Sequence, residues 1–582
     1  MHTYIKPGTH IILRLPSGAM KIVEAIPNTT ISISKFGSVP VNLLLGRPYF
    51  RTFEIADKTT DGDAPRLRVV PTSELNAEVL AEDAPDAETA EEKTEPAEGF
   101  DIVADDGSVL MKNNRLTVDD ASRQTLTMQE IEELKKAGTG SGKEIIEMIM
   151  KSHANLDEKT KFSLAKYTLR KTKKYMRRFT VLPVDVSTLA EYMVLEKEAS
   201  RIMELREECI GLIGSWAHAH YGGASQLHQS TEGTRVGGGR VLVVDETGGL
   251  VLASLAEKMD LLYEPEGQEN EDEAAQAQDS STNGTTTHPQ AADDDTSMQD
   301  VTASTGAAEH VPEESVPTTE AERQRQGHPK RKKPAHRHKG NLATTNTIHL
   351  IHANAQPNIS MLKYFGYDPN NPTPNHPLHN HLKPLSWLQL LDPAADATYE
   401  EPEKVDPQVL ETWKSGKRGA YYKKRRRWER CKSIVDETRE GGFDSLVVAS
   451  AMEPATILKH AVPLLRGAAH VVIYSPTIEP LTELMDLYSR DRKAAYIAHL
   501  ADESTTDPPP EEDFPVDPRL LLAPTLQTSK VRQWQVLPGR THPMMTGRGG
   551  AEGYIFTARK VVPVEGKIEA RGKFSKKRKL NA

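Results

Sequence analysis

Two clusters of basic residues carry the clearest chemistry in this sequence. The first gathers seven cations within one short stretch: Lys166, Arg170, Lys171, Lys173, Lys174, Arg177 and Arg178. The second is the run 421–430, which includes Arg427 and Arg430 and has aromatic residues towards both ends. Lysine and arginine neutralise phosphates and release counterions, while aromatic faces and arginine planes stack on unpaired bases. Together the clusters favour contact with RNA, although each one alone is compatible with a solvated surface.

The first cluster is placed by a helix that we predict over residues 161–179. Apolar residues (Phe162, Ala165, Leu169, Met176 and Phe179) fall on one helical face, and cations (Lys166, Arg170, Lys173 and Arg177) recur on another. A capping-box spacing at 127–130 predicts an earlier helix at 131–137, and a further helix is expected at 143–153. Residues 113–200 therefore read as a helical connector.

The N-terminal part, residues 1–112, reads as β structure. Short strand-like runs separated by Gly, Pro and Asn occupy residues 4–56 and predict a small antiparallel β-barrel. Residues 57–99 are acidic and rich in Ala and Pro, so we expect a disordered insertion there. Residues 100–111 are expected to return to the barrel as a final strand or hairpin.

The C-terminal part alternates buried-type strands with helical stretches, which predicts a mostly parallel α/β sheet. A polar segment at 264–345, almost without aromatic residues, predicts a disordered linker that divides this domain into 201–263 and 346–562. Residues 530–537 and 553–561 are expected to be two strands joined by a long loop. Residues 563–582 form a basic C-terminal tail.

Bulk composition excludes several classes of protein. The formal net charge of −10 alone argues against a nucleic-acid partner, but acid and base occupy different stretches of the chain. The two cysteines, Cys209 and Cys431, are far apart, which excludes a disulfide framework and a Cys-based zinc site. With no signal peptide and no apolar run near the ~18 residues of a membrane span, we expect a soluble intracellular protein. His376, His379 and His381 lack Cys or carboxylate partners, so no metal site is predicted.

Four segments resemble the non-catalytic subunits of the eukaryotic tRNA adenine-N1 methyltransferase, a heteromer that methylates a T-loop adenosine. They are ISISKFGS at 31–38, KFSLAKY at 161–167, VVDETGGL at 243–250 and WQVLPGRTHP at 534–543. The last string is long and unusual, and is therefore specific. The resemblance covers nearly everything outside the two low-complexity segments. It implies a barrel, a connector and a Rossmann-like methyltransferase domain, assembled with a catalytic sister subunit as a two-plus-two tetramer.

Within this resemblance, the turn that begins at Asp245 stands where an active relative has acid-x-Gly-x-Gly-x-Gly. Glycine lets the backbone approach the donor, S-adenosylmethionine. Here Gly248 and Gly249 are followed by Leu250 and further bulky residues, which we expect to clash with the donor. Residues 448–452 also lack the acid that related catalytic subunits place after this strand. The resemblance therefore implies that this chain binds no cofactor and catalyses no reaction, and that the sister subunit binds S-adenosylmethionine.

A third polar group, Arg540, Thr541 and His542, is expected in the loop of the terminal hairpin. Exposed polar loops on rigid scaffolds often bind ligands, so we expect this tip to meet tRNA or the active site of the sister subunit. The alternative is a structural loop in which His542 caps a turn.

Two basic runs are typical of nuclear import signals and predict a nuclear protein: Lys330, Arg331, Lys332 and Lys333, and Lys576, Lys577, Arg578 and Lys579. Extra phosphate binding by these segments is the competing interpretation, and both can hold.

The sequence thus predicts a tRNA-binding, non-catalytic subunit of the complex that forms N1-methyladenosine in the T-loop, with no membrane partner. The predicted RNA-binding residues are Lys161, Lys166, Tyr167, Arg170, Lys171, Lys174, Arg177, Arg427, Arg430, Arg540, Thr541 and His542. Two alternatives stay open. One is an active S-adenosylmethionine-dependent RNA methyltransferase with an unusual motif, and the other is an RNA-binding scaffold of a different complex.

Overall fold

The computed structural model describes most of the chain outside its low-complexity segments. These residues are 3–33, 37–56, 66–75, 102–103, 109–111, 126–127, 129–131, 133, 142–152, 161–220, 222, 227–229, 235–264, 343, 345–501, 509–528, 531, 534–537, 540–544 and 552–564. The chain divides into two units, and all of the described residues belong to the one formed by 1–264 and 342–582. Nearly all of the predicted linker, both predicted import signals and most of the basic tail lie outside the described residues. None of the described helices is both long and apolar enough to cross a membrane.

The N-terminal sheet is antiparallel, in the order β2 (Met20–Glu24), β1 (His10–Arg14), β9 (Arg178–Pro183), β5 (Thr52–Ala56) and β6 (Arg66–Val69). Phe53 and Phe179 stack in its core with ring centroids 5.6 Å apart. The strands β3 (Thr30–Ser32) and β4 (Ser38–Pro40) pair separately, ahead of the 3-10 turn η2 (Val41–Leu43). Within the described residues the edge strands β2 and β6 do not pair with each other, so closure into a barrel stays a prediction.

Two expectations for this region were wrong, and a third holds in part. The predicted helix 161–179 ends early, because α4 (Lys161–Tyr175) gives way to β9, whose side chains are almost all buried. The predicted disordered insertion contains β6, which pairs along β5. Residues 100–111 contain the expected hairpin, since β7 (Ile102–Val103) pairs with β8 (Val109–Met111), but within the described residues this hairpin is separate from the main sheet.

The described part of the predicted connector, residues 113–200, contains the expected helices and also the strand β9. Thr127 and Glu130 form the expected capping box, with the Thr127 N–H donating to the Glu130 carboxylate at 2.8 Å and the Glu130 N–H donating to the Thr127 hydroxyl at 3.3 Å. Next come α3 (Lys143–Lys151) and α4, which share a small apolar core. After β9 the chain forms α5 (Val186–Glu196), η6 (Ala199–Ile202) and α6 (Glu207–Trp216).

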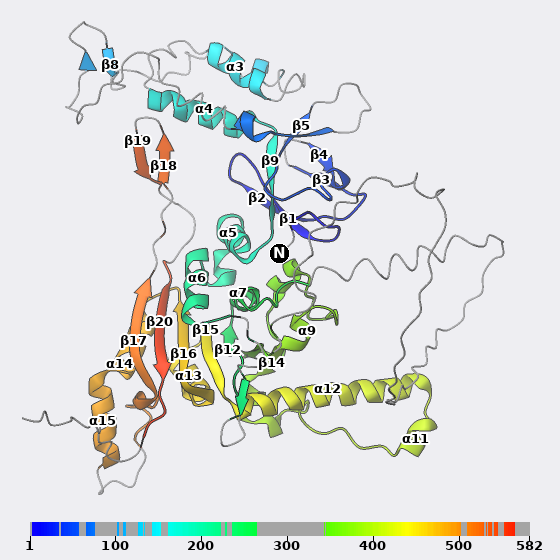
Figure 1. Ribbon diagram of the computed structural model, residues 1–582, viewed down its shortest axis with the longest axis vertical. Coiled ribbons are helices and arrows are strands. Elements are labelled where there is room, and N and C mark those ends of the chain that lie inside the picture. Colours follow the sequence, from blue (N-terminus) through cyan, green and yellow to red (C-terminus); the bar gives the residue numbers. More distant parts are fainter. Residues whose placement is uncertain are drawn as a thin grey trace, which may run out of the picture. The chain divides into compact units, whose positions relative to one another are not determined.

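The C-terminal domain is a mixed, Rossmann-like sheet of seven strands, as the alternation of strands and helices predicts. Its order is β14 (Leu382–Ser386), β13 (Thr347–His352), β12 (Arg240–Asp245), β15 (Phe443–Ala449), β16 (Leu465–Ser475), β20 (Tyr554–Lys560) and β17 (Leu521–Thr528). The first five strands are parallel, whereas β20 and β17 are antiparallel to their neighbours (Figure 1).

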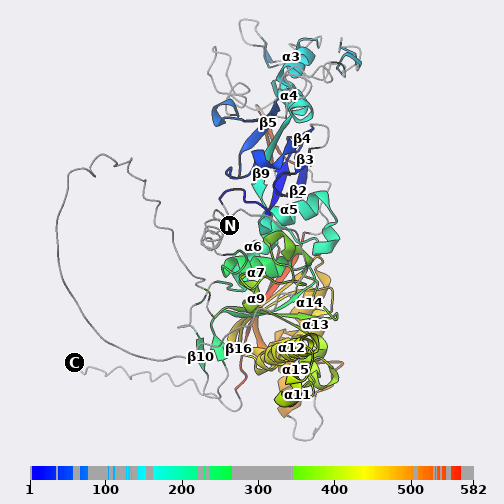
Figure 2. The same ribbon diagram turned by 90° about the vertical axis from the view of Figure 1, so that its right-hand side faces the viewer.

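Helices cover both faces of this sheet. On one face lie α5, α6 and α7 (Leu250–Lys258), and on the other α12 (Ser415–Glu440), α13 (Pro454–Ala461) and α14 (Glu479–Leu487) (Figure 2). The smaller elements are β10 (Leu227–Gln229), β11 (Arg235–Gly237), η9 (Ser360–Phe365), α9 (Leu378–His381), α10 (Trp387–Leu391), η10 (Pro393–Ala395), α11 (Pro407–Glu411), η11 (Val462–Leu464), α15 (Arg490–Ala501) and η12 (Pro518–Leu520).

The last strands differ from the prediction. The partner of β20 is β17, at 521–528, and not the expected segment 530–537. Instead, β18 (Trp534–Leu537) pairs with β19 (Arg540–Pro543) in a separate two-stranded ribbon. The ribbon lies in the connection between β17 and β20 (Figure 1).

Candidate functional site

The turn after β12 is closed by hydrogen bonds among its own residues. One oxygen of the Asp245 carboxylate accepts from the N–H and the hydroxyl of Thr247, at 2.7 and 2.5 Å, and the other accepts from the N–H of Leu252 at 2.8 Å. Burial raises the pKa of Asp245, and these hydrogen bonds oppose the rise. The carboxylate therefore caps the first turn of α7 and is fully occupied by the chain itself.

The glycines of this turn are covered by η9 and the residue before it. Gly248 and Gly249 have φ of +74° and +90°, a region that favours glycine. A Cβ on Gly249 would lie 3.1 Å from the Ile359 Cα, and one on Gly248 would lie 3.3 Å from the Met361 Cγ. The Met361 N–H also donates to the Gly248 carbonyl at 3.0 Å. Ile359 and the start of η9 thus pack directly against the two glycines of the turn.

The sequence did not predict that Ile359 and η9 pack on this turn. We expected Leu250 to obstruct the donor, but its side chain is fully buried in the core at the start of α7. That role for Leu250 stays a prediction. The apolar spacing of Ile359, Met361 and Leu362 was the available signal. It predicts a buried face but not which surface that face covers.

Beside the turn, the Glu246 carboxylate holds the end of β15, and the sequence did not predict this contact either. Residues 448–452 carry no acid, but Glu246, which follows β12, reaches across. Its Oε2 accepts from the N–H of Ala451 at 2.7 Å, and its own N–H donates to the Ala449 carbonyl at 2.8 Å. The Glu246 carboxylate therefore holds the loop that follows β15.

The first basic cluster lies on α4 and directly after it. Arg170, Lys173 and Lys174 are exposed. Lys171 Nζ lies 4.9 Å from the centroid of the Tyr167 ring, and partial burial, together with the charge of Lys174, lowers the pKa of Lys171. Lys166 and Arg177 are half-buried, and the side chain of Lys161 is outside the described residues.

Arg178 does not belong to this basic surface. It begins β9 and is buried, with Nη2 2.8 Å from a Glu74 oxygen and Nε 3.4 Å from a Glu54 oxygen. Because the helix ends at Tyr175, Arg178 points into the N-terminal domain and serves its structure. Its inclusion in the cluster was wrong.

The second cluster lies on α12, a helix of 26 residues. Its aromatic residues have structural partners, since the Trp428 Nε1–H donates to the Tyr399 carbonyl at 3.0 Å and the Tyr421 hydroxyl accepts from the Val405 N–H at 3.3 Å. These two rings seat the helix on the segment that precedes it. Tyr422 is exposed, and so are most of the cations: Lys417, Arg418, Lys423, Lys424, Arg426, Arg427, Arg430 and Lys432.

The third group lies on a strand and not in a loop, because Arg540, Thr541 and His542 form most of β19. Thr541 is exposed, and His542 is half-buried and pairs with Gln535 of β18. The side chain of Arg540 is outside the described residues. On β18, Trp534 is 58% exposed and Val536 72% exposed. The ribbon therefore presents apolar side chains next to polar ones.

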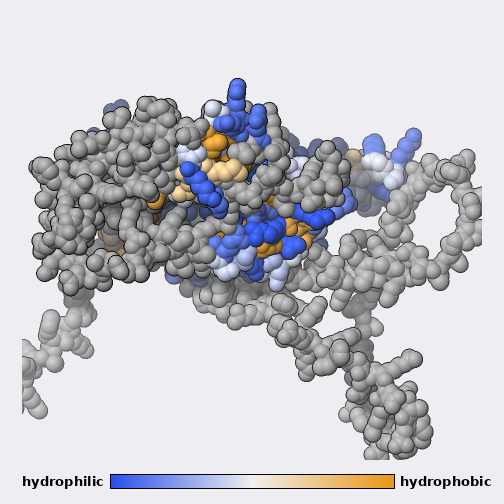
Figure 3. All heavy atoms as spheres, turned by 90° about the horizontal axis from the view of Figure 1, so that it is seen from above, coloured by the Kyte–Doolittle hydropathy of each residue, from blue (hydrophilic) through white to orange (hydrophobic). Residues whose placement is uncertain are grey.

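The structure brings two of the three groups together. The ribbon strand β18 contacts α4, although more than 350 positions separate them in the sequence (Figure 1). Viewed from that end, the described surface shows hydrophilic side chains gathered around a smaller apolar group (Figure 3). The helix α12 makes its main contacts with β14, α10 and η11 instead. It therefore presents its cations from the sheet domain.

The histidines at 376–381 make separate hydrogen bonds. The His376 Nδ1 accepts from the Leu378 N–H at 3.2 Å, and the His381 Nδ1 lies 2.6 Å from the Asn346 carbonyl. The backbone carbonyl of His379 accepts from Arg430 at 3.0 Å. His376 thus caps the start of α9, whereas His379 and His381, on that helix, contact Arg430 and Asn346.

Comparison with known proteins gives consistent results. The model of the Gcd10p family matches residues 4–414. The chain is 48% identical over 606 aligned residues to a protein of Aspergillus fumigatus and 46% identical over 600 to one of Aspergillus oryzae. Both are named tRNA (adenine(58)-N(1))-methyltransferase non-catalytic subunit, and each alignment covers 100% of this chain and 96% of the relative. Among solved structures, the tRNA (m1A58) methyltransferase TrmI of Aquifex aeolicus matches 96% of this chain and 100% of its own, with 9% identity and a TM-score of 0.34.

Proposed function

The chain belongs to the Gcd10p family, and from that premise we propose that it holds tRNA for a catalytic sister subunit and binds no methyl donor itself. It is a non-catalytic subunit of the tRNA m1A58 methyltransferase. The sister subunit supplies S-adenosylmethionine and the catalytic acid.

The observation that carries this proposal is the closed turn after β12. A donor site needs an accessible glycine backbone and a free acid. Here the Asp245 carboxylate accepts three hydrogen bonds from its own turn, and Ile359 and Met361 pack on the two glycines. Opening this site requires moving η9 and uncapping α7, so the domain keeps the fold of a methyltransferase without the donor's space.

The proposed tRNA surface combines α4 with the ribbon. The exposed cations Arg170, Lys173 and Lys174 neutralise backbone phosphates, and the exposed Trp534 offers a flat ring for an unpaired base. Folded RNA is recognised largely by shape, so a second patch on α12, with Arg427 and Arg430, extends the contact to another part of the same tRNA.

Assembly and location complete the proposal. Two copies of this chain and two of the sister subunit form the complex, with a pseudo-symmetric interface between related folds. The basic runs 330–333 and 576–579 direct the chain to the nucleus.

The test separates donor binding from tRNA binding. Labelled S-adenosylmethionine is dialysed against this chain, the sister subunit and the mixture, and methyl transfer to tRNA is measured with the same three samples. We expect donor binding by the sister subunit and full activity in the mixture alone. Saturable donor binding or methyl transfer by this chain on its own would overturn the proposal.

A further inference from the structure

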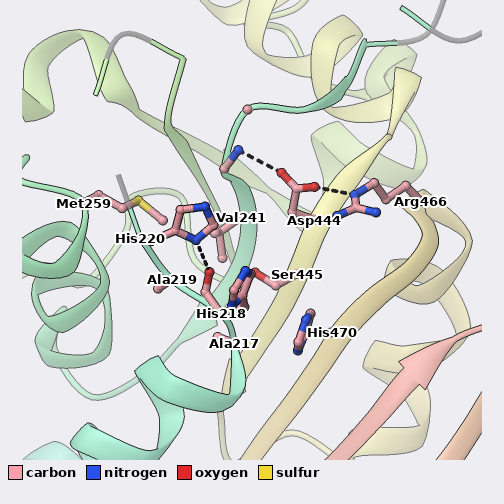
Figure 4. A pocket seen from close by; sticks show the side chains of 12 residues that line it. Ala217, His218, Ala219, His220, Val241, Met259, Asp444, Ser445, Arg466 and His470 are labelled. Carbon is pink, nitrogen blue, oxygen red and sulfur yellow. Dashed lines mark hydrogen bonds and ion pairs between the residues drawn. The ribbon is translucent and has the colours of Figure 1, made fainter. Parts of the chain in front are cut away.

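A pocket of about 220 Å³ opens where β12, β15 and β16 begin (Figure 4). Three imidazoles line it: His218 and His220, from the segment after α6, and His470, from β16. The ring of His218 lies 4.6 Å from that of His220 and 5.4 Å from that of His470, between centroids. Ser445 and Arg466 complete its polar lining on this side.

This pocket is at the opposite end of the sheet from the donor turn. It includes Gly239, which precedes β12, whereas Asp245 ends that strand. A strand of six residues spans roughly 16–20 Å. Ligands of open α/β sheets bind outside the carboxyl ends of the strands, so the cofactor chemistry of this fold does not account for a polar pocket at the amino ends.

Ser445 is the first sign of a ligand. Its side chain is 1% exposed, and its hydroxyl has no hydrogen-bond partner within the part of the chain that is described. It sits on β15 between Val241 of β12 and His470 of β16, its register partners. A buried hydroxyl without a hydrogen-bond partner lowers the stability of the fold. Because Ser445 lines the pocket, a ligand bound there can supply the missing partner.

The lining holds one cation and one carboxylate. The carboxylate is Asp444, and both of its oxygens are occupied: one by the N–H groups of Gly239 and Arg240, at 2.9 and 3.0 Å, and the other by Arg466. A second guanidinium, that of Arg559, is not part of the lining but donates to the Nε2 of His470 at 2.7 Å. With Asp444 satisfied by these donors, the charge of Arg559 adds positive potential beside the pocket.

The imidazoles are fixed in orientation. The Nδ1 of His220 lies 2.7 Å from the His218 carbonyl, and the Nδ1 of His470 lies 2.7 Å from the Trp216 carbonyl. A carbonyl accepts only, so each Nδ1 carries a proton. Partial burial lowers the pKa of His470, and the charge of Arg559 lowers it further, as expected where the local potential is positive.

His218 also ends helix α6. It has φ of 54°, the left-handed conformation with which many helices terminate. The cap is held by two hydrogen bonds, since His218 donates to the Ser215 carbonyl at 3.1 Å and Ala219 donates to the Gly214 carbonyl at 3.1 Å. The helix end thereby fixes where the backbone of His218 enters the pocket.

We propose that this pocket binds a phosphate group, with the Ser445 hydroxyl and the Arg466 guanidinium as its donors and the imidazoles as its walls. A tetrahedral oxyanion has acceptor oxygens for both donors, and the volume leaves room for an attached sugar. The phosphate comes either from a nucleic-acid backbone or from free solution. The inference does not depend on the proposed tRNA surface, because it uses none of its residues.

Equilibrium dialysis of the full-length chain against radiolabelled inorganic phosphate tests the proposal. We expect saturable binding of one phosphate per chain, and at least a ten-fold weaker Kd for Ser445→Ala and for Arg466→Gln. Ser475→Ala is the matched control, since Ser475 is a buried serine at the other end of β16 whose Oγ accepts from Thr477 at 3.3 Å. The control is expected to bind phosphate like the unmodified chain.

Circular dichroism of each variant confirms that it is folded, and Ser445→Ala removes one oxygen without changing the packing. Absence of saturable binding, or equal binding by Ser445→Ala and the unmodified chain, overturns the proposal. Added tRNA identifies the source. Competitive displacement of the labelled phosphate assigns the site to an RNA phosphate, whereas phosphate that stays bound beside tRNA assigns it to the free anion.

Discussion

Replacing Arg170, Lys173 and Lys174 by alanine is expected to weaken tRNA binding while the chain stays folded. All three side chains are exposed on the last turns of α4, and none of them contributes to an apolar core. The loss to stability is small, because cations in the last turn of a helix contribute only about 0.3–1 kcal/mol each. A change in affinity can therefore be separated from unfolding.

The size of the effect follows from counterion release. Each phosphate contact contributes about 0.7–0.9 to the slope of log K against log salt concentration. At 0.15 M salt this amounts to roughly four- to five-fold in affinity per contact, and on the order of a hundred-fold for three contacts. The slope itself is expected to become less steep by about 2–3.

Filter binding or fluorescence anisotropy with labelled tRNA, repeated from 50 to 300 mM salt, measures both quantities. The matched control replaces Arg201, Lys404 and Lys459, three cations of exposed ion pairs elsewhere on the chain, by alanine. It removes the same net charge. If both triple variants lose the same affinity, or if the salt slope of the α4 variant is unchanged, the basic face of α4 is only solvated and the reasoning is refuted.

Three further predictions concern stability. Arg178→Met is expected to lower the free energy of unfolding in urea by about 1–3 kcal/mol, because it removes one of the two guanidiniums, Arg178 and Arg68, that pair with Glu54 and Glu74, and to leave the salt slope of tRNA binding unchanged. Burial alone would raise the pKa of Glu437, but its interaction with His349, followed by the ion pair with Lys383, lowers that pKa to about 2. Glu437→Gln is expected to lower the free energy of unfolding by roughly 1–2 kcal/mol above pH 4.5. This difference from the unmodified chain should vanish as the pH falls towards 2, and urea unfolding of both proteins over that pH range measures it. Thr247→Val takes one donor from the buried Asp245 and is expected to lower the unfolding free energy by about 1–3 kcal/mol; an unchanged urea midpoint would contradict that bond.

Much of the C-terminal sheet follows from local pattern. The continuous apolar runs VLVV at 241–244 and LVVA at 446–449 contain no turn residue, and they lie in the buried parallel strands β12 and β15. The division of the sheet between α7 and β13 was also predicted, because composition changes abruptly there. These features depend on neighbours in the sequence.

The secondary-structure predictions were wrong where a contact with a segment distant in the sequence determines the local structure. The apolar residues of 161–179 fit a helical face, but Phe179 is drawn into the N-terminal sheet by its stack on Phe53. Likewise, β6 lies in an acidic stretch, yet it forms because Arg68 pairs with Glu54 and Glu74. No local pattern contains such information.

The candidate site shows the same division. The degenerate glycine turn and the basic residues of α4 and α12 could be identified from residue types and spacing. The packing of η9 on Gly249, the bond from Ala451 to Glu246 and the contact of β18 with α4 could not, because each joins segments far apart in the sequence. The first basic cluster also lost a member in the structure. Arg177 and Arg178 are adjacent in the sequence, but only Arg178 is buried.

The position of β9 has a consequence for synthesis on the ribosome. It lies between β1 and β5, which within the described residues pair with it and not with each other. The N-terminal domain therefore cannot complete its sheet until residue 183 has emerged from the exit tunnel, after the whole connector has been translated. Until then β1 and β5 expose open edges, so nascent chains stalled before β9 should depend on chaperones and those stalled well beyond it should not.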